Sequence, residues 1–165
     1  MKGDFNNKRI DSVSRVVHAS PQSIYKVFLD PIAWSVWLPP KGMKGKMYEF
    51  DASDGGFYHM ILTYDEPDNL TQGKTTKDTD EIKGRFLKFI PNKRVVQLVE
   101  FESDNPIYAG EMMMTWSLTA VSKGTQVSIV CENVPKGIRK EDHEVGLAST
   151  LENLEDYMEG KLTLN

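Results

Sequence analysis

Few residues in the sequence have the types and spacing that local catalytic or metal-binding motifs require. The three histidines, His18, His59 and His143, lie far apart, and none belongs to a His-Glu-x-x-His pair. The single cysteine, Cys131, lies in an apolar strand-like segment, where burial makes a thiol inert. The sequence also lacks a Gly-x-Ser-x-Gly elbow and paired metal-binding cysteines. We therefore predict no catalytic residue, no metal site and no cofactor from local motifs, and only the fold can assemble a site from distant residues.

Methionine and aromatic side chains suit a different kind of chemistry, the binding of an apolar molecule. Met112, Met114 and Trp116 alternate along one face of a predicted strand, and methionine adapts to ligands of varied shape. The plainer interpretation is that this face is core, with the indole N–H of Trp116 donating to a backbone carbonyl. Trp37 lies in a short predicted helix, where it either anchors that helix or forms a pocket wall.

One histidine is the best polar candidate for orienting a ligand. His59 alternates with Phe57 and Ile61 in an otherwise apolar segment. The plainer interpretation is a structural histidine with a satisfied hydrogen bond. If Phe57 and Ile61 face inward, His59 faces inward too and becomes a polar group in an apolar pocket.

A long amphipathic helix is expected over residues 141–160. Its apolar stripe consists of Leu147, Leu151, Leu154 and Met158. These residues are spaced four, three and four apart and fall on one helix face. Gly146 costs the helix up to ~1 kcal/mol relative to alanine, which close approach to a sheet or room for a ligand would explain. We assign Gly146, Leu147 and Thr150 to a pocket-lining half of the helix, and Leu154 to plain core.

The rest of the sequence predicts the elements that position these residues. Ser20 and Pro21 form a helix start, Asp30-Pro31 ends that helix, and a second short helix follows over residues 32–38. A first strand ends near His18. Further strands are expected over residues 47–51, 57–64, 81–90, 94–102, 111–121 and 125–132, with a possible bulge at Gly84. This order indicates an α+β fold: an antiparallel sheet of six to seven strands, two short N-terminal helices and a long C-terminal helix.

Composition excludes several classes of protein. The chain has 165 residues, enough for a sizeable core without disulfides or metals. Its net charge of −4 gives no general attraction for nucleic acid or for an anionic membrane. No stretch approaches the ~20 apolar residues of a membrane span, and one cysteine favours a reducing compartment. We expect a cytoplasmic protein without nucleic-acid partners or membrane insertion.

The order of several short motifs resembles a known family. The motifs are Trp37-Leu38-Pro39-Pro40, Gly55-Gly56-Phe57-Tyr58, Gly84-Arg85-Phe86, Ile90-Pro91-Asn92-Lys93-Arg94-Val95-Val96, Gly124-Thr125-Gln126-Val127 and His143-Glu144-Val145-Gly146-Leu147. Together they resemble the homologues of the activator of the heat-shock-protein-90 ATPase, in the START-like (SRPBCC) superfamily. The resemblance implies a helix-grip fold, in which a curved sheet wraps the last helix around a deep apolar cavity. It covers one domain, residues 11–160, after a flexible lead-in over residues 1–10.

The resemblance leaves several functions open. Leu147 stands where the family commonly has tryptophan, so the pocket is expected to differ in shape. Our leading hypothesis is non-enzymatic binding of a small hydrophobic or amphipathic (lipid-like) molecule, with residues 41–46 and 103–110 as gating loops. A co-chaperone-like contact with a chaperone is the second hypothesis, although this chain has no room for the additional N-terminal domain of the eukaryotic co-chaperones. An enzyme of hydrolase or cyclase type in the same cavity is the third, and a homodimer through a sheet edge or helix is a further alternative.

Overall fold

One curved antiparallel sheet and three α-helices make up the structure. The computed structural model describes residues 9–66 and 73–162 of the chain. The strands are β1 (Ile10–Val17), β2 (Met43–Phe50), β3 (Phe57–Tyr64), β4 (Thr79–Ile90), β5 (Arg94–Glu102), β6 (Met112–Val121) and β7 (Gly124–Glu132). The helices are α1 (Pro21–Val27), α2 (Pro31–Trp37) and α3 (Lys140–Met158), with a short 3₁₀ helix, η1 (Pro106–Tyr108). The strand order in the sheet is β1-β7-β6-β5-β4-β3-β2.

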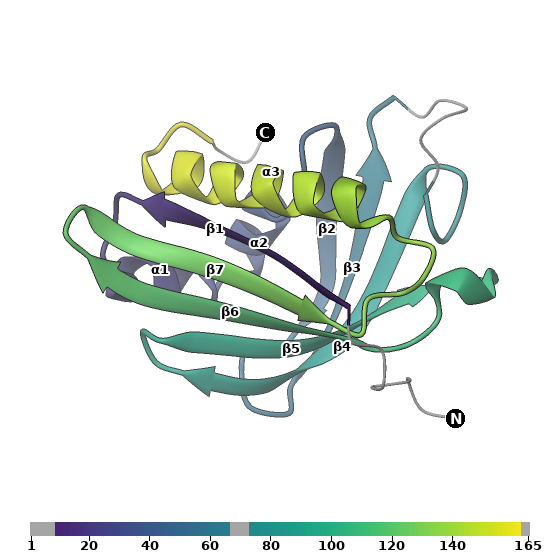
Figure 1. Ribbon diagram of the computed structural model, residues 1–165, viewed down its shortest axis with the longest axis horizontal. Coiled ribbons are helices and arrows are strands. Elements are labelled where there is room, and N and C mark those ends of the chain that lie inside the picture. Colours follow the sequence, from purple (N-terminus) through teal and green to yellow (C-terminus); the bar gives the residue numbers. More distant parts are fainter. Residues whose placement is uncertain (1–8, 67–72, 163–165) are drawn as a thin grey trace.

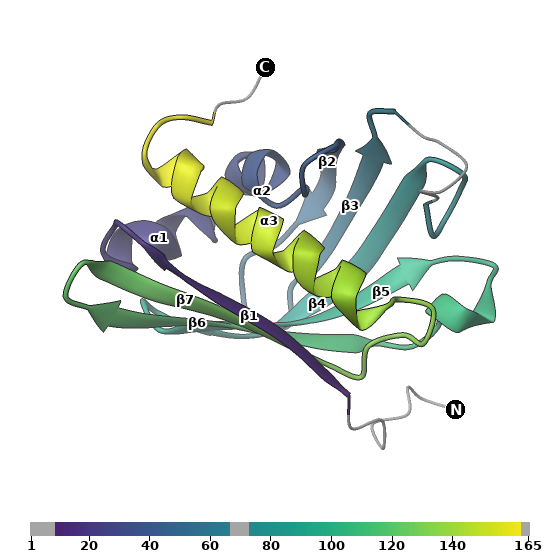
Figure 2. The same cartoon turned by 45° about the horizontal axis from the view of Figure 1, so that its top comes forward.

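The long helix crosses the concave face of the sheet. Figures 1 and 2 show α3 lying across this face, with the sheet curving around it. The short helices α1 and α2 lie on the same side of the sheet, toward the C-terminal end of α3. The N-terminal half of α3 therefore spans a part of the sheet that α1 and α2 leave uncovered. This is the helix-grip fold that the sequence predicts.

Two capping residues start the short helices. The hydroxyl of Ser20 accepts a hydrogen bond from the backbone N–H of Ser23 at 3.1 Å, as its position before Pro21 predicts. Asp30 was expected only to end the first helix. Its carboxylate also accepts a hydrogen bond from the backbone N–H of Ile32 at 2.9 Å, so this residue begins α2 as well.

Apart from shifts of one or two residues at strand ends, three features of the strands need comment. The expected loop over residues 41–46 is wrong from Met43 onward, because Lys44 and Lys46 alternate outward in β2. Between them Gly45 faces inward, where a Cβ would lie only 2.5 Å from the terminal methyl of Met60. The sheet register shifts between Phe86 and Lys88 rather than at Gly84, which corrects the predicted bulge. Strand β1 begins at Ile10, the last residue of the expected lead-in, and residues 1–8 lie outside the described part of the chain.

Aromatic side chains fill the end of the core that α1 and α2 cover. Phe28, Trp34, Trp37 and Trp116 are all buried, and their ring centroids lie 4.6–5.6 Å apart. Edge-to-face pairs dominate, which is a favourable arrangement for aromatic rings. The core is therefore densely packed at this end, and any cavity has to lie toward the other end of α3.

Candidate functional site

A cavity of about 520 Å³ lies between the sheet and the N-terminal half of α3. Its volume falls within the range of pockets that bind small molecules. Apolar side chains make up most of its wall: Met43, Met47, Phe50, Met60, Leu62, Ile82, Phe86, Val99, Met112, Met114 and Leu147. The five methionines give this wall adaptable side chains that can adjust to the shape of an occupant.

Five of the nine residues proposed from sequence line this cavity. They are Met112, Met114, Gly146, Leu147 and Thr150. At Gly146 an added Cβ would have one near neighbour among the described residues, the Cγ of Pro40 at 3.9 Å. The helix thus does not need this glycine for close packing, and the space beside it belongs to the cavity. The hydroxyl of Thr150 donates to the backbone carbonyl of Leu38 at 2.8 Å, so it fastens the cavity wall.

The two tryptophans that were predicted to line the cavity lie in the core. Trp37 and Trp116 are fully buried and do not reach the cavity; Trp34 lines it in their place. The indole N–H of Trp116 donates to the side-chain oxygen of Gln97 at 2.6 Å, rather than to a backbone carbonyl. The indole nitrogen of Trp37 has no hydrogen-bond partner among the described residues. Packing against the other aromatic rings determines both positions.

Phe57 and His59 face away from the cavity, which corrects their predicted placement. Strand β3 alternates with Tyr58, Met60 and Leu62 facing inward, so its odd-numbered residues point to the outer face of the sheet. Phe57 is 61% exposed there. The Nε2 of His59 lies 2.6 Å from a carboxylate oxygen of Glu81 on the neighbouring strand. His59 is therefore a structural histidine with a satisfied hydrogen bond, on the surface side of the sheet.

Polar side chains gather at one end of the cavity. Tyr64, Lys74, Asp80 and His143 all line it, and they come from the end of β3, the segment before β4, the start of β4 and the first turns of α3. The ammonium group of Lys74 lies 3.0 Å from a carboxylate oxygen of Asp80 and 4.8 Å from the ring centroid of Phe101. Burial, with the charge of Asp80 nearby, raises the pKa of Tyr64 to about 12, which keeps its hydroxyl protonated.

Few features of the sequence predict this polar end. His143 carried one local signal, since it lies at the edge of the apolar stripe of the last helix. Lys74 and Asp80 lie in a run of charged and hydroxyl residues, which is typical of an exposed turn. Asp80 lies two positions before Ile82, and this spacing was the available sign that Asp80 continues the inward face of β4.

His143 is held by a buried carboxylate. Its Nδ1 lies 2.7 Å from the carboxylate of Asp11, which is fully buried in β1. Arg9 makes two further hydrogen bonds to the same carboxylate, at 2.9 and 2.8 Å. Burial alone would raise the pKa of Asp11, but the hydrogen bonds from Arg9 and His143 outweigh it and lower that pKa to about 2. Burial also lowers the pKa of His143, against the pull of Asp11, so the ring is neutral at pH 7.

The rim of the cavity is fastened to α3. Besides the bond from Thr150, the backbone N–H of Lys41 donates to the hydroxyl of Ser149 at 2.9 Å. The side-chain amide of Asn153 donates to the carbonyl of Pro39 at 2.8 Å. Lys41 and Met43 line the cavity, whereas no residue of the other expected gating loop, 103–110, does so within the described part of the chain.

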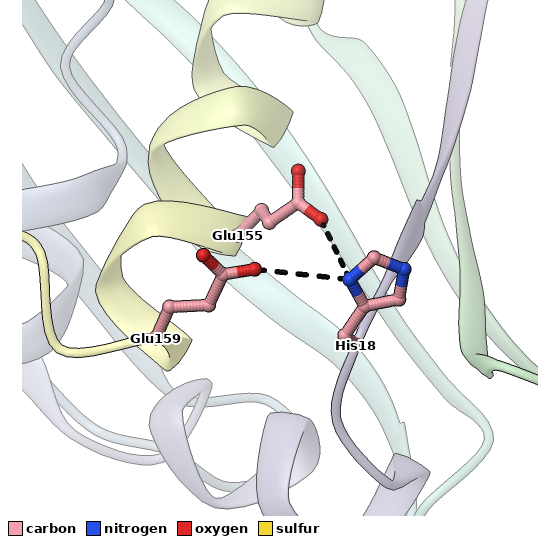
Figure 3. Close-up of side chains that lie close together, drawn as sticks. All are labelled: His18, Glu155 and Glu159. Carbon is pink, nitrogen blue, oxygen red and sulfur yellow. Dashed lines mark ion pairs between the residues drawn. The ribbon is translucent and has the colours of Figure 1, made fainter.

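A second polar group of side chains lies at the far end of α3 (Figure 3). The Nδ1 of His18 lies 3.6 Å from Glu155 and 3.8 Å from Glu159. Their ligand-type atoms all lie within 4.8 Å of one another, which is close enough for a metal ion to bridge them. Each carboxylate, however, already has a cation on its other oxygen: Arg15 at 2.7 Å from Glu155, and Lys161 at 2.8 Å from Glu159. We interpret the group as an ion-pair cluster that ties the end of β1 to α3.

Comparisons with known proteins agree with this architecture. The family model described as "Activator of Hsp90 ATPase homolog 1-like protein" matches residues 18–159. No curated protein matches the chain. Within the described residues, no helix is long and apolar enough to cross a membrane.

Solved structures of similar proteins come from several bacteria. The crystal structure of protein CV1439 from Chromobacterium violaceum is 31% identical, with a TM-score of 0.79, and the match covers 91% of this chain and 96% of that one. A solution structure from Arthrobacter aurescens has a TM-score of 0.76 at 13% identity, covering 95% and 89% of the two chains, and so shows the fold alone. The AHSA1-like protein from Aeromonas hydrophila likewise shows the fold, with a TM-score of 0.68, 12% identity, and coverage of 92% and 93%. Since the family model spans most of the sequence, the chain belongs to the family of Activator of Hsp90 ATPase homolog 1-like proteins.

Proposed function

We propose that this protein binds a small apolar or amphipathic molecule in the cavity between its sheet and α3, without chemical conversion. The observation that carries the proposal is the cavity itself, with about 520 Å³ of space and a mostly apolar wall. Affinity would come from apolar area removed from water, at about 25 cal/mol per Å² before the costs of ordering are subtracted.

Native mass spectrometry of the protein purified from its own host tests the proposal directly. We expect a second mass peak, heavier than the bare chain by the mass of one small molecule. In a parallel assay, a neutral fluorescent probe such as N-phenyl-1-naphthylamine should bind. At a concentration of one hundred times its Kd, it should stabilise the fold by about 2.7 kcal/mol. A bare chain in the first assay together with no probe binding in the second would refute the proposal.

A contact with a chaperone is a second candidate, favoured by the family match. The name of the family model refers to an activator of the Hsp90 ATPase. The outer face of the sheet presents exposed aromatic side chains, Tyr48 and Phe57, that such a contact could cover. If this function holds, adding the protein to Hsp90 should change its ATPase rate, and replacing Phe57 by serine should weaken the effect. An unchanged ATPase rate over a wide range of concentrations would exclude it.

An enzyme of hydrolase or cyclase type is a third candidate. It requires at least two titratable side chains within hydrogen-bond reach in the cavity, and Lys74 and Asp80 meet this requirement at 3.0 Å. Cys131 offers no nucleophile, because burial raises the pKa of its thiol to about 12. Incubating the protein with the molecule that co-purifies, and following its mass over time, separates conversion from binding. The expected cytoplasmic location and a homodimer stay predictions.

A further inference from the structure

We propose that the polar end of the cavity selects an uncharged hydroxyl head group, an alcohol or a phenol, over a carboxylate or an ether. The inference rests on the proposed binding function and names the chemical class of the ligand. The polar end consists of Tyr64, Lys74, Asp80 and His143. Two properties of these side chains lead to the inference: the hydrogen-bonding groups that they leave unused, and the balance of their charges.

The unused hydrogen-bonding groups include both donors and an acceptor. Asp80 already accepts from the backbone N–H of Lys74 at 2.7 Å and from its ammonium group at 3.0 Å. An ammonium group has three protons, so that of Lys74 can still donate to a ligand. The hydroxyl of Tyr64 makes no hydrogen bond within the described residues. At His143 the Nδ1 is engaged by Asp11 at 2.7 Å, which leaves Nε2 as the ring nitrogen available to the cavity.

The protonation state of His143 makes its free nitrogen an acceptor. The carboxylate of Asp11 can only accept, so the proton of the neutral ring resides on Nδ1. Nε2 then carries a lone pair. An occupant has to donate to His143 and accept from Lys74 or Tyr64, and a hydroxyl group does both with one atom. An ether oxygen cannot donate, and a carboxylate would place a negative oxygen against a lone pair.

The balance of charges at the polar end excludes a carboxylate there on separate grounds. Lys74 is paired with Asp80, and Arg9 is paired with the fully buried Asp11. The neighbouring charged groups also form pairs, Lys140 with Glu144 at 3.3 Å and Arg139 with Asp142 at 4.0 Å. Lys41 also lines the cavity, but it lies at the rim beside Ser149. A carboxylate at the polar end would therefore be a partly buried charge without a partner of its own, which is unfavourable, whereas a neutral head group leaves every pair intact.

Competition against N-phenyl-1-naphthylamine at pH 7.5 tests the inference with three ligands of equal chain length: n-decanol, decyl methyl ether and decanoate. We expect n-decanol to bind about two- to tenfold more tightly than the ether, the value of one net hydrogen bond. Decanoate should bind at least about tenfold more weakly than n-decanol. The variant His143→Asn keeps an amide N–H for Asp11 but removes the acceptor at the Nε2 position.

In His143→Asn the preference for n-decanol over the ether should disappear while the affinity for the ether is kept. His59→Asn, which changes a histidine on the outer face, is the matched control and should keep the preference. Any one of three results would overturn the inference. These are equal affinities for the alcohol and the ether, a preference for the alcohol that survives in His143→Asn, and tighter binding of decanoate than of n-decanol. If neither the probe nor the ether binds, the proposed function itself fails, and this inference falls with it.

Discussion

Replacing Gly146 by tryptophan should close the cavity at little cost in stability. Among the residues that the structure describes, a Cβ at this position would meet only the Cγ of Pro40, at the ordinary contact distance of 3.9 Å. Glycine is up to ~1 kcal/mol worse than alanine in a helix, and tryptophan lies between the two. The gain in helix propensity is offset by the ordering of the indole, since a fixed side chain loses rotamer entropy. We therefore expect the free energy of unfolding to change by less than about 1 kcal/mol.

The effect on binding should be much larger than the effect on stability. The indole group would occupy the space beside α3 that an apolar ligand needs, so the affinity for N-phenyl-1-naphthylamine should fall at least about tenfold. Gly146→Ala is the matched control, because its single methyl group meets no close neighbour. It should gain about 0.5–1 kcal/mol of stability, or a few degrees in melting temperature, and bind the probe as the original protein does. Probe titration and thermal unfolding measure both quantities on the same samples.

Two results would refute this reasoning. If Gly146→Trp binds the probe with unchanged affinity, the ligand lies elsewhere in the protein. If Gly146→Ala loses binding as severely as Gly146→Trp, the glycine matters for its backbone freedom, and the space beside it does not belong to the binding site.

Three further predictions address the core, the buried histidine His143 and the outer face. Leu154 is fully buried, and Leu154→Ala should cost about 2–5 kcal/mol in the free energy of unfolding by denaturant while keeping the order of ligand affinities. The pKa of His143 is lower in the folded protein than its ordinary value of 6.5. Below pH 6.5 the unfolded chain therefore takes up a proton more readily than the folded protein, and the free energy of unfolding decreases as the pH falls. Denaturation curves should therefore show less loss of stability between pH 7 and pH 5 in His143→Asn than in the original protein; identical slopes would contradict this. Phe57→Ser should leave probe binding unchanged, because Phe57 lies on the outer face, and weakened binding would place the ligand on that face.

The sequence predicted elements well where local chemistry determines them. Strands β3 and β5 begin and end at the predicted residues, 57–64 and 94–102. Glycine and proline punctuate both segments, and aromatic and β-branched residues are frequent between these points. Ser20 likewise caps α1 through its own side chain, and this interaction depends on neighbours in sequence alone.

The orientation of side chains was harder to predict where both faces of a strand are apolar. Phe57 and Ile61 are as hydrophobic as Tyr58 and Met60, so composition does not distinguish the inner from the outer face of β3. The distinction comes from pairing with β4, where Tyr58 stands opposite Gly84 and its hydroxyl donates to the carbonyl of Leu98 at 2.6 Å. Such a contact joins strands that are far apart in sequence.

The polar end of the cavity was hidden for a related reason. Lys74 and Asp80 are ordinary surface residues by type, and only tertiary packing places them beside α3. The prediction for Trp37 was wrong in the opposite sense. Its size suggested a residue of the cavity wall, but three other aromatic residues surround it in the core. Contacts between residues that are far apart in the sequence determine whether a charged residue is buried and whether a large one is enclosed. A short segment of sequence therefore does not reveal either outcome.

The attachment of α3 to β1 also determines when the cavity can exist during folding. His143 and Asp11 are 132 residues apart, and Arg15 and Glu155, at the other end of the helix, are 140 residues apart. Both attachments join the first strand of the chain to its last helix. On the ribosome, the sheet can pair before α3 has emerged, and its apolar concave face stays exposed until the final residues arrive. Such long-range contacts make folding slow, so a nascent chain carries this exposed face until α3 is complete and can dock.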